Sequence, residues 1–171
     1  SGAKPKRTIL FVGFAGEEFG LLGAKAFCER HKDKLGKIAN LFNRDGGPTP
    51  PVGISVPKAM YDDFVEICKP IKEINPEYPF EVTVAQPRKK PTTMGGTDAS
   101  VFAVKGVPTY GFREQDFKGY NFNSGEIWHT ERDLYTKSIP VYMEHTSVVT
   151  AIVALGVANL KHQLSREGMY T

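Results

Sequence analysis

The chain has 171 residues, a hydrophobic content of 40% and a formal net charge of +3, which favour one soluble globular domain with a genuine core. The basic clusters at residues 4–7 and 88–90 lack an aromatic platform or a known binding motif, so we expect no nucleic-acid partner. Cys28 and Cys68 lie apart in apolar helical patterns, which argues against a zinc knuckle or a dense disulfide framework. The longest apolar run, residues 148–160, is too short to span a bilayer.

The first predicted element is a buried strand over residues 8–15, which continues through Gly16 into a helix over residues 19–28. A strand this apolar is typical of a parallel or mixed sheet covered by helices, where ligands bind at the carboxyl ends of the strands. Glu17 and Glu18 lie at that point. One carboxylate could hold a cation while the other handles the proton of a water bound to that cation, although acidic residues also favour helix N-termini in general.

Asp45 occupies a comparable position. Residues 38–43 predict a second buried strand that ends at Asp45 and at the turn of residues 46–48. An aspartate beside two glycines is also common in ordinary turns, so a ligand and a turn residue are both open interpretations.

The rest of the pattern predicts an α/β fold with a mixed sheet flanked by helices. The expected elements are a Pro-rich connection, a helix that begins near residues 55–57 with an apolar stripe through residue 71, strands over residues 80–84 and 106–112, a short helix over residues 99–104, a loop over residues 113–128, and a helix over residues 139–163.

Asp98 and His129 complete the set of candidate residues. Asp98 precedes the short helix, where it could cap the helix N-terminus or support a metal ligand from behind. His129 follows the long loop, and a lone histidine in such a place is often simply hydrogen-bonded to its neighbours. Carboxylates and one imidazole that meet at strand ends nevertheless form the donor set of zinc, which leaves a position for water in catalytic sites.

Four motifs follow one another along the chain: the Glu-Glu segment at residues 7–24, Asn-Arg-Asp at 43–45, the stretch at 95–108, and Trp-His-Thr-Glu-Arg-Asp at 128–133. In this order they resemble the M28 family of co-catalytic zinc peptidases, from residue 6 to the final helix. The resemblance implies a zinc-exopeptidase architecture of the phosphorylase/hydrolase-like kind. It also implies hydrolysis of peptide substrates, in an aminopeptidase-like manner, with two zinc ions in the complete domain.

The resemblance also implies a role for each candidate residue. Glu17 matches the general base, and Glu18 and His129 match the ligands of one zinc ion. Asp45 matches a ligand of the other zinc ion, and Asp98 matches an aspartate that supports the ligands.

Trp128 departs from the tyrosine that some relatives carry before the metal histidine. Because an indole offers only an N–H donor, we expect the oxyanion to be supported from elsewhere, such as residues 113–120. Tyr120, Phe122 and Trp128 could line a pocket for a hydrophobic substrate side chain, or they could serve packing alone.

A second departure concerns the metal ligands. The family's first metal histidine and its bridging aspartate lie upstream of the Glu-Glu segment, on and near a strand beside it. His31 lies far from any strand end, and His145 and His162 are expected on the surface or side of the last helix.

We therefore expect residues 1–171 to be the C-terminal part of a peptidase catalytic domain that lacks its N-terminal strands. Its zinc site would be incomplete and the chain alone inactive, and the open sheet edge would favour self-association. Two alternatives stay open: a glutaminyl-cyclase-like acyltransferase with a single zinc ion, and a non-catalytic binding module. The resemblance also implies a secreted or periplasmic location.

Overall fold

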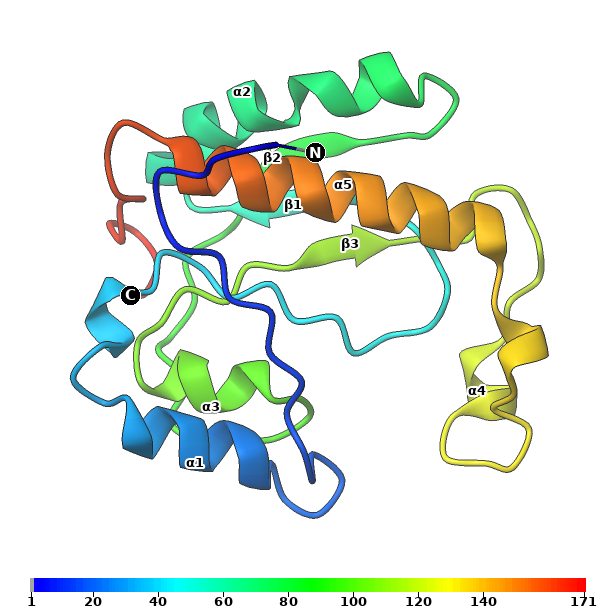
Figure 1. Ribbon diagram of the computed structural model, residues 1–171, viewed down its shortest axis with the longest axis horizontal. Coiled ribbons are helices and arrows are strands. Elements are labelled where there is room, and N and C mark those ends of the chain that lie inside the picture. Colours follow the sequence, from blue (N-terminus) through cyan, green and yellow to red (C-terminus); the bar gives the residue numbers. More distant parts are fainter. Residues whose placement is uncertain (1) are drawn as a thin grey trace.

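The computed structural model describes residues 2–171, whose helices and strands are interspersed along the chain (Figure 1). The elements are α1 (Leu22–Arg30), the 3-10 helix η1 (Leu35–Lys37), β1 (Pro51–Val56), α2 (Lys58–Ile74), β2 (Glu81–Val84), α3 (Ala99–Val104), β3 (Phe112–Glu114), α4 (Ser124–Ile127), the 3-10 helix η2 (Tyr135–Lys137) and α5 (Pro140–Asn159).

Within residues 2–171, three strands form one mixed sheet in the order β2-β1-β3. The central strand β1 runs parallel to β2, with Ile54 opposite Val82, and antiparallel to β3, with Ile54 opposite Phe112. Two helices, α2 and α5, pack against each other and against β1 (Figure 1). This arrangement confirms the predicted α/β class with a mixed sheet and flanking helices.

The main core lies between α2, α5 and the sheet. Ile54, Phe64 and Val153 come from these three parts and have no exposed surface. The apolar stripe predicted for α2 is confirmed, because its residues Met60, Phe64, Cys68 and Ile71 are buried. A second cluster joins α1 and α3 through Cys28 and Phe102, so the two free cysteines, Cys28 and Cys68, belong to separate apolar clusters.

Among residues 2–171, α5 is the one helix that is long and apolar enough to cross a membrane by length and composition. Its residues Val149 and Val153 are buried in the main core. Core helices of soluble proteins share these properties, so the finding is weak evidence for a membrane span.

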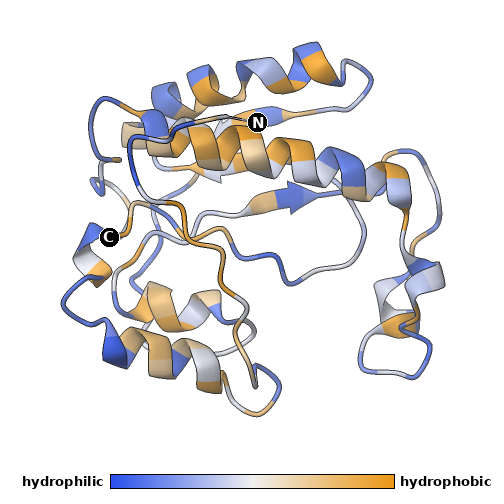
Figure 2. Ribbon diagram, in the orientation of Figure 1, coloured by the Kyte–Doolittle hydropathy of each residue, from blue (hydrophilic) through white to orange (hydrophobic). Residues whose placement is uncertain are grey.

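The predicted strand over residues 8–15 is wrong. The structure assigns no strand there, and no other segment of residues 2–171 pairs with it. Phe14 packs on Phe102 at a ring distance of 5.7 Å, but Leu10 is 68% exposed and Phe11 is 94% exposed. Figure 2 shows much of this segment as a hydrophobic stretch outside any helix or strand. An apolar sequence satisfies the local requirement for a strand, but a strand also needs a neighbour to accept its backbone hydrogen bonds.

The predicted strand over residues 38–43 is also absent, although this segment still runs beside a partner. The Asn40 side chain bonds both the N–H and the C=O of Tyr110 at 3.0 Å, and the amide of Leu41 donates to the carbonyl of Pro108 at 2.8 Å. The Asn40 side chain thus replaces the backbone hydrogen bonds that a paired strand would make to Tyr110. Asn40 pairs with Tyr110 and Arg44 with Glu114, each 70 residues on, so the two segments run in the same direction.

Several other elements begin or end at residues that differ from those predicted. The Pro-rich connection contains the central strand β1, which begins at Pro51, a position where a strand tolerates proline. The strand expected over residues 106–112 is wrong except at Phe112, where β3 begins. The loop expected over residues 113–128 contains the end of β3 and the short helix α4. The helices expected over residues 19–28, 99–104 and 139–163 are confirmed as α1, α3 and α5, with shifted ends for α1 and α5.

The expectation that His145 lies on the surface or side of the last helix is wrong, because its ring is only 1% exposed. The Asn75 side-chain nitrogen lies 2.8 Å from His145 Nδ1. His162 lies beyond the end of α5 and contacts Asp63 at 2.9 Å.

Burial lowers the pKa of His145 from its ordinary value of 6.5, with a smaller contribution from Lys118 and an opposing one from the Pro51 carbonyl. Below pH 6.5 the unfolded chain then binds a proton that the folded chain does not, so the free energy of unfolding should fall as the pH decreases. Urea unfolding above and below this pH measures the effect. His145→Gln should reduce the pH dependence, whereas the control His31→Gln, whose ring packs on Phe27, should keep it; equal slopes in wild type and His145→Gln would contradict the prediction.

Candidate active site

Glu18 and His129 meet although 111 residues separate them in the chain. His129 Nε2 lies 2.8 Å from Glu18 Oε1, and both side chains are more than half exposed. The backbone of His129 is in the left-handed region, with a φ of 56°, and its ring stacks on the neighbouring Trp128 at 4.2 Å. A non-glycine residue in this region costs about 1–3 kcal/mol and is concentrated at functional sites. The two residues that the sequence assigned to one zinc ion therefore share one place in the structure.

The tight turn after residue 15 places Glu17 and Glu18. Gly16 has a φ of 69°, which a side chain would disfavour, so the chain leaves its extended path here as predicted. The Glu17 carbonyl then accepts from the amides of Gly20 at 3.0 Å and Leu21 at 2.8 Å. These bonds close a turn directly before α1 and so fix the two glutamates close to the start of that helix.

The charges of the other candidate residues act on the carboxyl group of Glu17. Partial burial raises the pKa of its carboxyl, and the negative charges of Glu18, Asp45 and Asp98 raise it further, while His129 acts in the opposite direction. Such mutual effects require the groups to be close together. A carboxyl group is a side chain that can accept and return a proton during hydrolysis.

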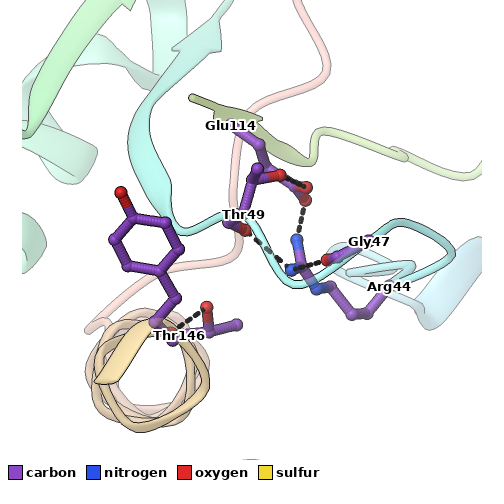
Figure 3. A network of polar contacts seen from close by, with 6 residues as sticks. Arg44, Gly47, Thr49, Glu114 and Thr146 are labelled. Carbon is purple, nitrogen blue, oxygen red and sulfur yellow. Dashed lines mark hydrogen bonds and ion pairs between the residues drawn. The ribbon is translucent and has the colours of Figure 1, made fainter. Parts of the chain in front are cut away.

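The turn that follows Asp45 is held by Arg44. The Arg44 guanidinium donates to the carbonyls of Gly47 at 2.7 Å and Thr49 at 2.9 Å, and it forms an ion pair with Glu114 at the end of β3 (Figure 3). The Thr49 hydroxyl also donates to Glu114 at 3.3 Å. Arg44 thus ties the turn that follows Asp45 to the sheet. Sequence reasoning missed this role, although the position of an arginine directly before Asp45 was a usable signal.

Asp98 is buried at the start of α3 and is 8% exposed. Its side chain makes no capping hydrogen bond, so the capping interpretation is wrong. Its Oδ1 atom has no hydrogen-bond partner among residues 2–171. Burial raises the pKa of the Asp98 carboxyl, and the charge of Asp45 adds to this. A buried carboxylate oxygen without a partner is costly, and a nearby cation would offset that cost.

The donor set therefore fits a zinc centre in its chemistry, with carboxylates from Glu18, Asp45 and Asp98 and an imidazole from His129. It does not form a complete site, because the described residues contain no group of three or more such side chains arranged to hold one metal ion. The structure brings the predicted residues into one region, but it leaves their roles as predictions.

The family model for peptidase family M28 matches residues 1–153. The chain belongs to peptidase family M28. It is 30% identical over 165 residues to mouse carboxypeptidase Q, covering 96% of this chain and 32% of the relative. A stretch of 42 residues, 25% of this chain and 10% of the relative, is 48% identical to a probable zinc metalloprotease of Pyrenophora tritici-repentis.

Solved structures agree with M28 membership. The crystal structure of a peptidase M28 precursor from Shewanella amazonensis is 27% identical with a TM-score of 0.71, and the match covers 96% of this chain and 34% of the relative. Legionella pneumophila LapA, at 16% identity, a TM-score of 0.62 and coverage of 94% of this chain and 43% of the relative, supports the fold alone. The chain spans about a third of the length of the carboxypeptidase Q relatives.

Proposed function

We propose that this chain carries part of the active site of a zinc-dependent M28 peptidase that hydrolyses peptide bonds. The contact between Glu18 and His129 at 2.8 Å carries the proposal, because an oxygen ligand and a nitrogen ligand that are 111 residues apart in the chain meet there. The charges of Asp45 and Asp98, which act on Glu17, support the same location. Family membership and a relative named as a probable zinc metalloprotease support the reaction and the metal.

Each residue has a proposed role. Glu18 and His129 would hold one zinc ion, Asp45 would hold the second, and Asp98 would support the ligands. When bound, zinc supplies Lewis acidity that activates water and polarises the peptide carbonyl. Glu17 would accept the proton of the attacking water and return it to the leaving amine.

We further infer an exopeptidase with an aminopeptidase-like preference, as the motifs suggested, although several relatives are named carboxypeptidase Q. Tyr120, 51% exposed, and Trp128, 69% exposed, offer aromatic surface for a hydrophobic substrate side chain. Matched dipeptides with either the amino or the carboxyl end blocked would decide the preference. Cleavage of amino-blocked substrates alone would overturn the aminopeptidase assignment. An exported location, secreted or periplasmic, belongs to the same proposal, supported by a relative described as a precursor.

The 171-residue chain alone should show little or no peptide hydrolysis. A catalytic zinc normally has three protein ligands, and no three donors within residues 2–171 form such a group. We infer that the zinc pair needs further donors, and a longer form of the protein that turns over peptides would supply them. Full turnover by the 171-residue chain would show that this count of ligands is wrong.

Zinc binding can be tested on the chain itself, because its single tryptophan, Trp128, stacks on His129. Co²⁺ replaces Zn²⁺ at many sites, and a bound Co²⁺ ion would quench Trp128 fluorescence. His129→Ala and Glu18→Gln should weaken Co²⁺ and Zn²⁺ binding by at least about tenfold, because each removes a donor. His31→Ala is the matched control and should leave binding unchanged; unchanged binding in His129→Ala would refute the metal assignment.

A further inference from the structure

Asp116 organises the loop between β3 and α4. Its Oδ1 accepts hydrogen bonds from the Tyr142 hydroxyl at 2.7 Å and the Tyr120 amide at 3.1 Å, and its Oδ2 accepts from the Phe122 amide at 3.2 Å. The bond from Tyr142, followed by those from the loop amides, lowers the pKa of the Asp116 carboxyl, so it stays charged. This carboxylate therefore folds the loop around itself.

Tyr142 attaches that loop to the rigid part of the molecule. It lies in the first turn of α5 and has no exposed surface, and its hydroxyl oxygen also accepts from the Lys118 amide at 2.9 Å. The rings of Phe117 and Tyr120 contact the Tyr142 ring at centroid distances of 5.7 and 5.1 Å. One buried hydroxyl thus joins the loop to α5 at both Asp116 and Lys118.

The same loop touches the turn that follows Asp45. A Cβ atom at Gly47 would lie 2.5 Å from Cε1 and 2.6 Å from Cζ of Phe122, so the ring of Phe122 lies directly against this glycine. The carbonyl of Gly47 is also the group that Arg44 holds at 2.7 Å. The turn after Asp45 is therefore held by Arg44 on one side and by Phe122 on the other.

Beyond Phe122, residues 123–128 connect the loop to His129, and hydrogen bonds within this segment fix its course. The Asn123 side chain accepts from the Gly125 amide at 3.1 Å and begins α4, and Ile127 of α4 is buried. The Trp128 amide donates to Ser124 at 2.8 Å, which brings the chain directly to His129. The position of the His129 ring therefore depends on where the loop is anchored.

We propose that Asp116 and Tyr142 are positioning residues that fix the Asp45 turn and the His129 loop relative to each other. Neither residue touches the candidate ligands; Asp116 acts through the Phe122 contact with Gly47 and through the path to His129. The consequence for metal binding rests on the proposed function, whereas the coupling between the two loops rests on geometry alone. A residue that only stabilised its own loop would leave the Asp45 turn unaffected.

Hydrogen exchange and amide NMR spectra of the 171-residue chain test the coupling. Asp116→Asn and Tyr142→Phe should speed amide exchange in residues 117–123 by about tenfold or more, because hydrogen bonds from these amides are weakened or lost. They should also shift the amide resonances of Gly46 and Gly47, because Phe122 lies directly against Gly47. The matched controls are Asp62→Asn, at an exposed site on α2, and Tyr61→Phe, whose hydroxyl makes no hydrogen bond within residues 2–171. Faster exchange in residues 117–123 with unchanged resonances of Gly46 and Gly47, or no change in either segment, would overturn the proposal.

Gly47→Ala tests the same contact from the other side and away from α5. The new methyl group must displace Phe122, so exchange in residues 117–123 should again be faster, whereas Gly36→Ala, where nothing lies within 4 Å, is the control. If Asp116→Asn unfolds the whole chain, this variant decides: unchanged exchange in residues 117–123 would overturn the coupling.

Metal binding gives the second readout. Tyr142→Phe should weaken Co²⁺ quenching of Trp128 by about 10–100-fold in affinity, the usual effect of residues that orient ligands without touching the metal. Unchanged affinity in Tyr142→Phe would overturn the positioning role. If the wild-type chain binds no Co²⁺, the zinc proposal fails by itself, and the exchange pattern and the amide resonances then decide the coupling.

Discussion

Glu17→Gln is expected to lower kcat for peptide hydrolysis by about 10²–10⁴-fold while zinc remains bound, the usual contribution of a general base. Glutamine has nearly the same shape but cannot accept the proton of the attacking water. Because Glu17 is proposed to handle a proton rather than to hold the ion, zinc content should not change. The assay needs a form of the protein that turns over peptides, with kcat and bound zinc measured on the same samples.

Glu29→Gln provides the matched control, because Glu29 lies on α1 with an exposed carboxylate that pairs only with Lys32 within residues 2–171. It should leave kcat unchanged. A rise in KM with normal kcat would assign Glu17 to substrate binding instead. Loss of zinc in Glu17→Gln would make Glu17 a ligand and would require the roles of Glu17 and Glu18 to be exchanged.

The second large effect concerns self-association of the 171-residue chain, which we propose occurs through residues 8–15. Leu10 and Phe11 expose apolar surface, and no strand of residues 2–171 pairs with this segment. Burying two large apolar side chains contributes about 3–6 kcal/mol. Changing both residues to aspartate should therefore raise the dissociation constant by about 10²–10⁴-fold.

Sedimentation velocity over a range of concentrations measures this effect. The matched control replaces Leu134 and Tyr135 by aspartate, because these residues are also exposed but lie outside the segment. The control should associate like the wild type. A wild-type chain that stays monomeric at every concentration, with its sheet intact, would remove the basis for self-association.

Local pattern was enough to predict the helices α1, α2, α3 and α5, but not the short helix α4. The apolar stripe of α2 repeats with the helical period, and its residues Met60 and Phe64 are buried as expected. The strands were harder to predict because pairing depends on distant partners. Residues 8–15 have the composition of a strand, but no neighbouring strand pairs with them. β1 begins at a proline, yet it forms a strand because it pairs with both β2 and β3.

The candidate site likewise contains some residues that local sequence could identify and others that depend on distant partners. Glu17, Glu18, Asp45 and His129 could be selected from their residue types and their places after apolar segments, and the structure brings them near one another. Arg44 and Asp116 could not be selected in this way, because their partners are backbone groups and side chains far along the chain. Aspartate followed closely by glycine and asparagine indicates a turn, but it does not reveal that Tyr142 closes the turn.

The two cysteines have a consequence for the conditions that the protein can tolerate. Burial raises the pKa of the Cys68 thiol to about 12 and raises that of Cys28 as well, so neither forms an appreciable amount of thiolate at neutral pH. Each thiol is buried in a different apolar cluster, so the two sulfur atoms do not face each other. Oxidising surroundings, such as those outside the cell, would therefore not join these two side chains in a disulfide within the folded chain.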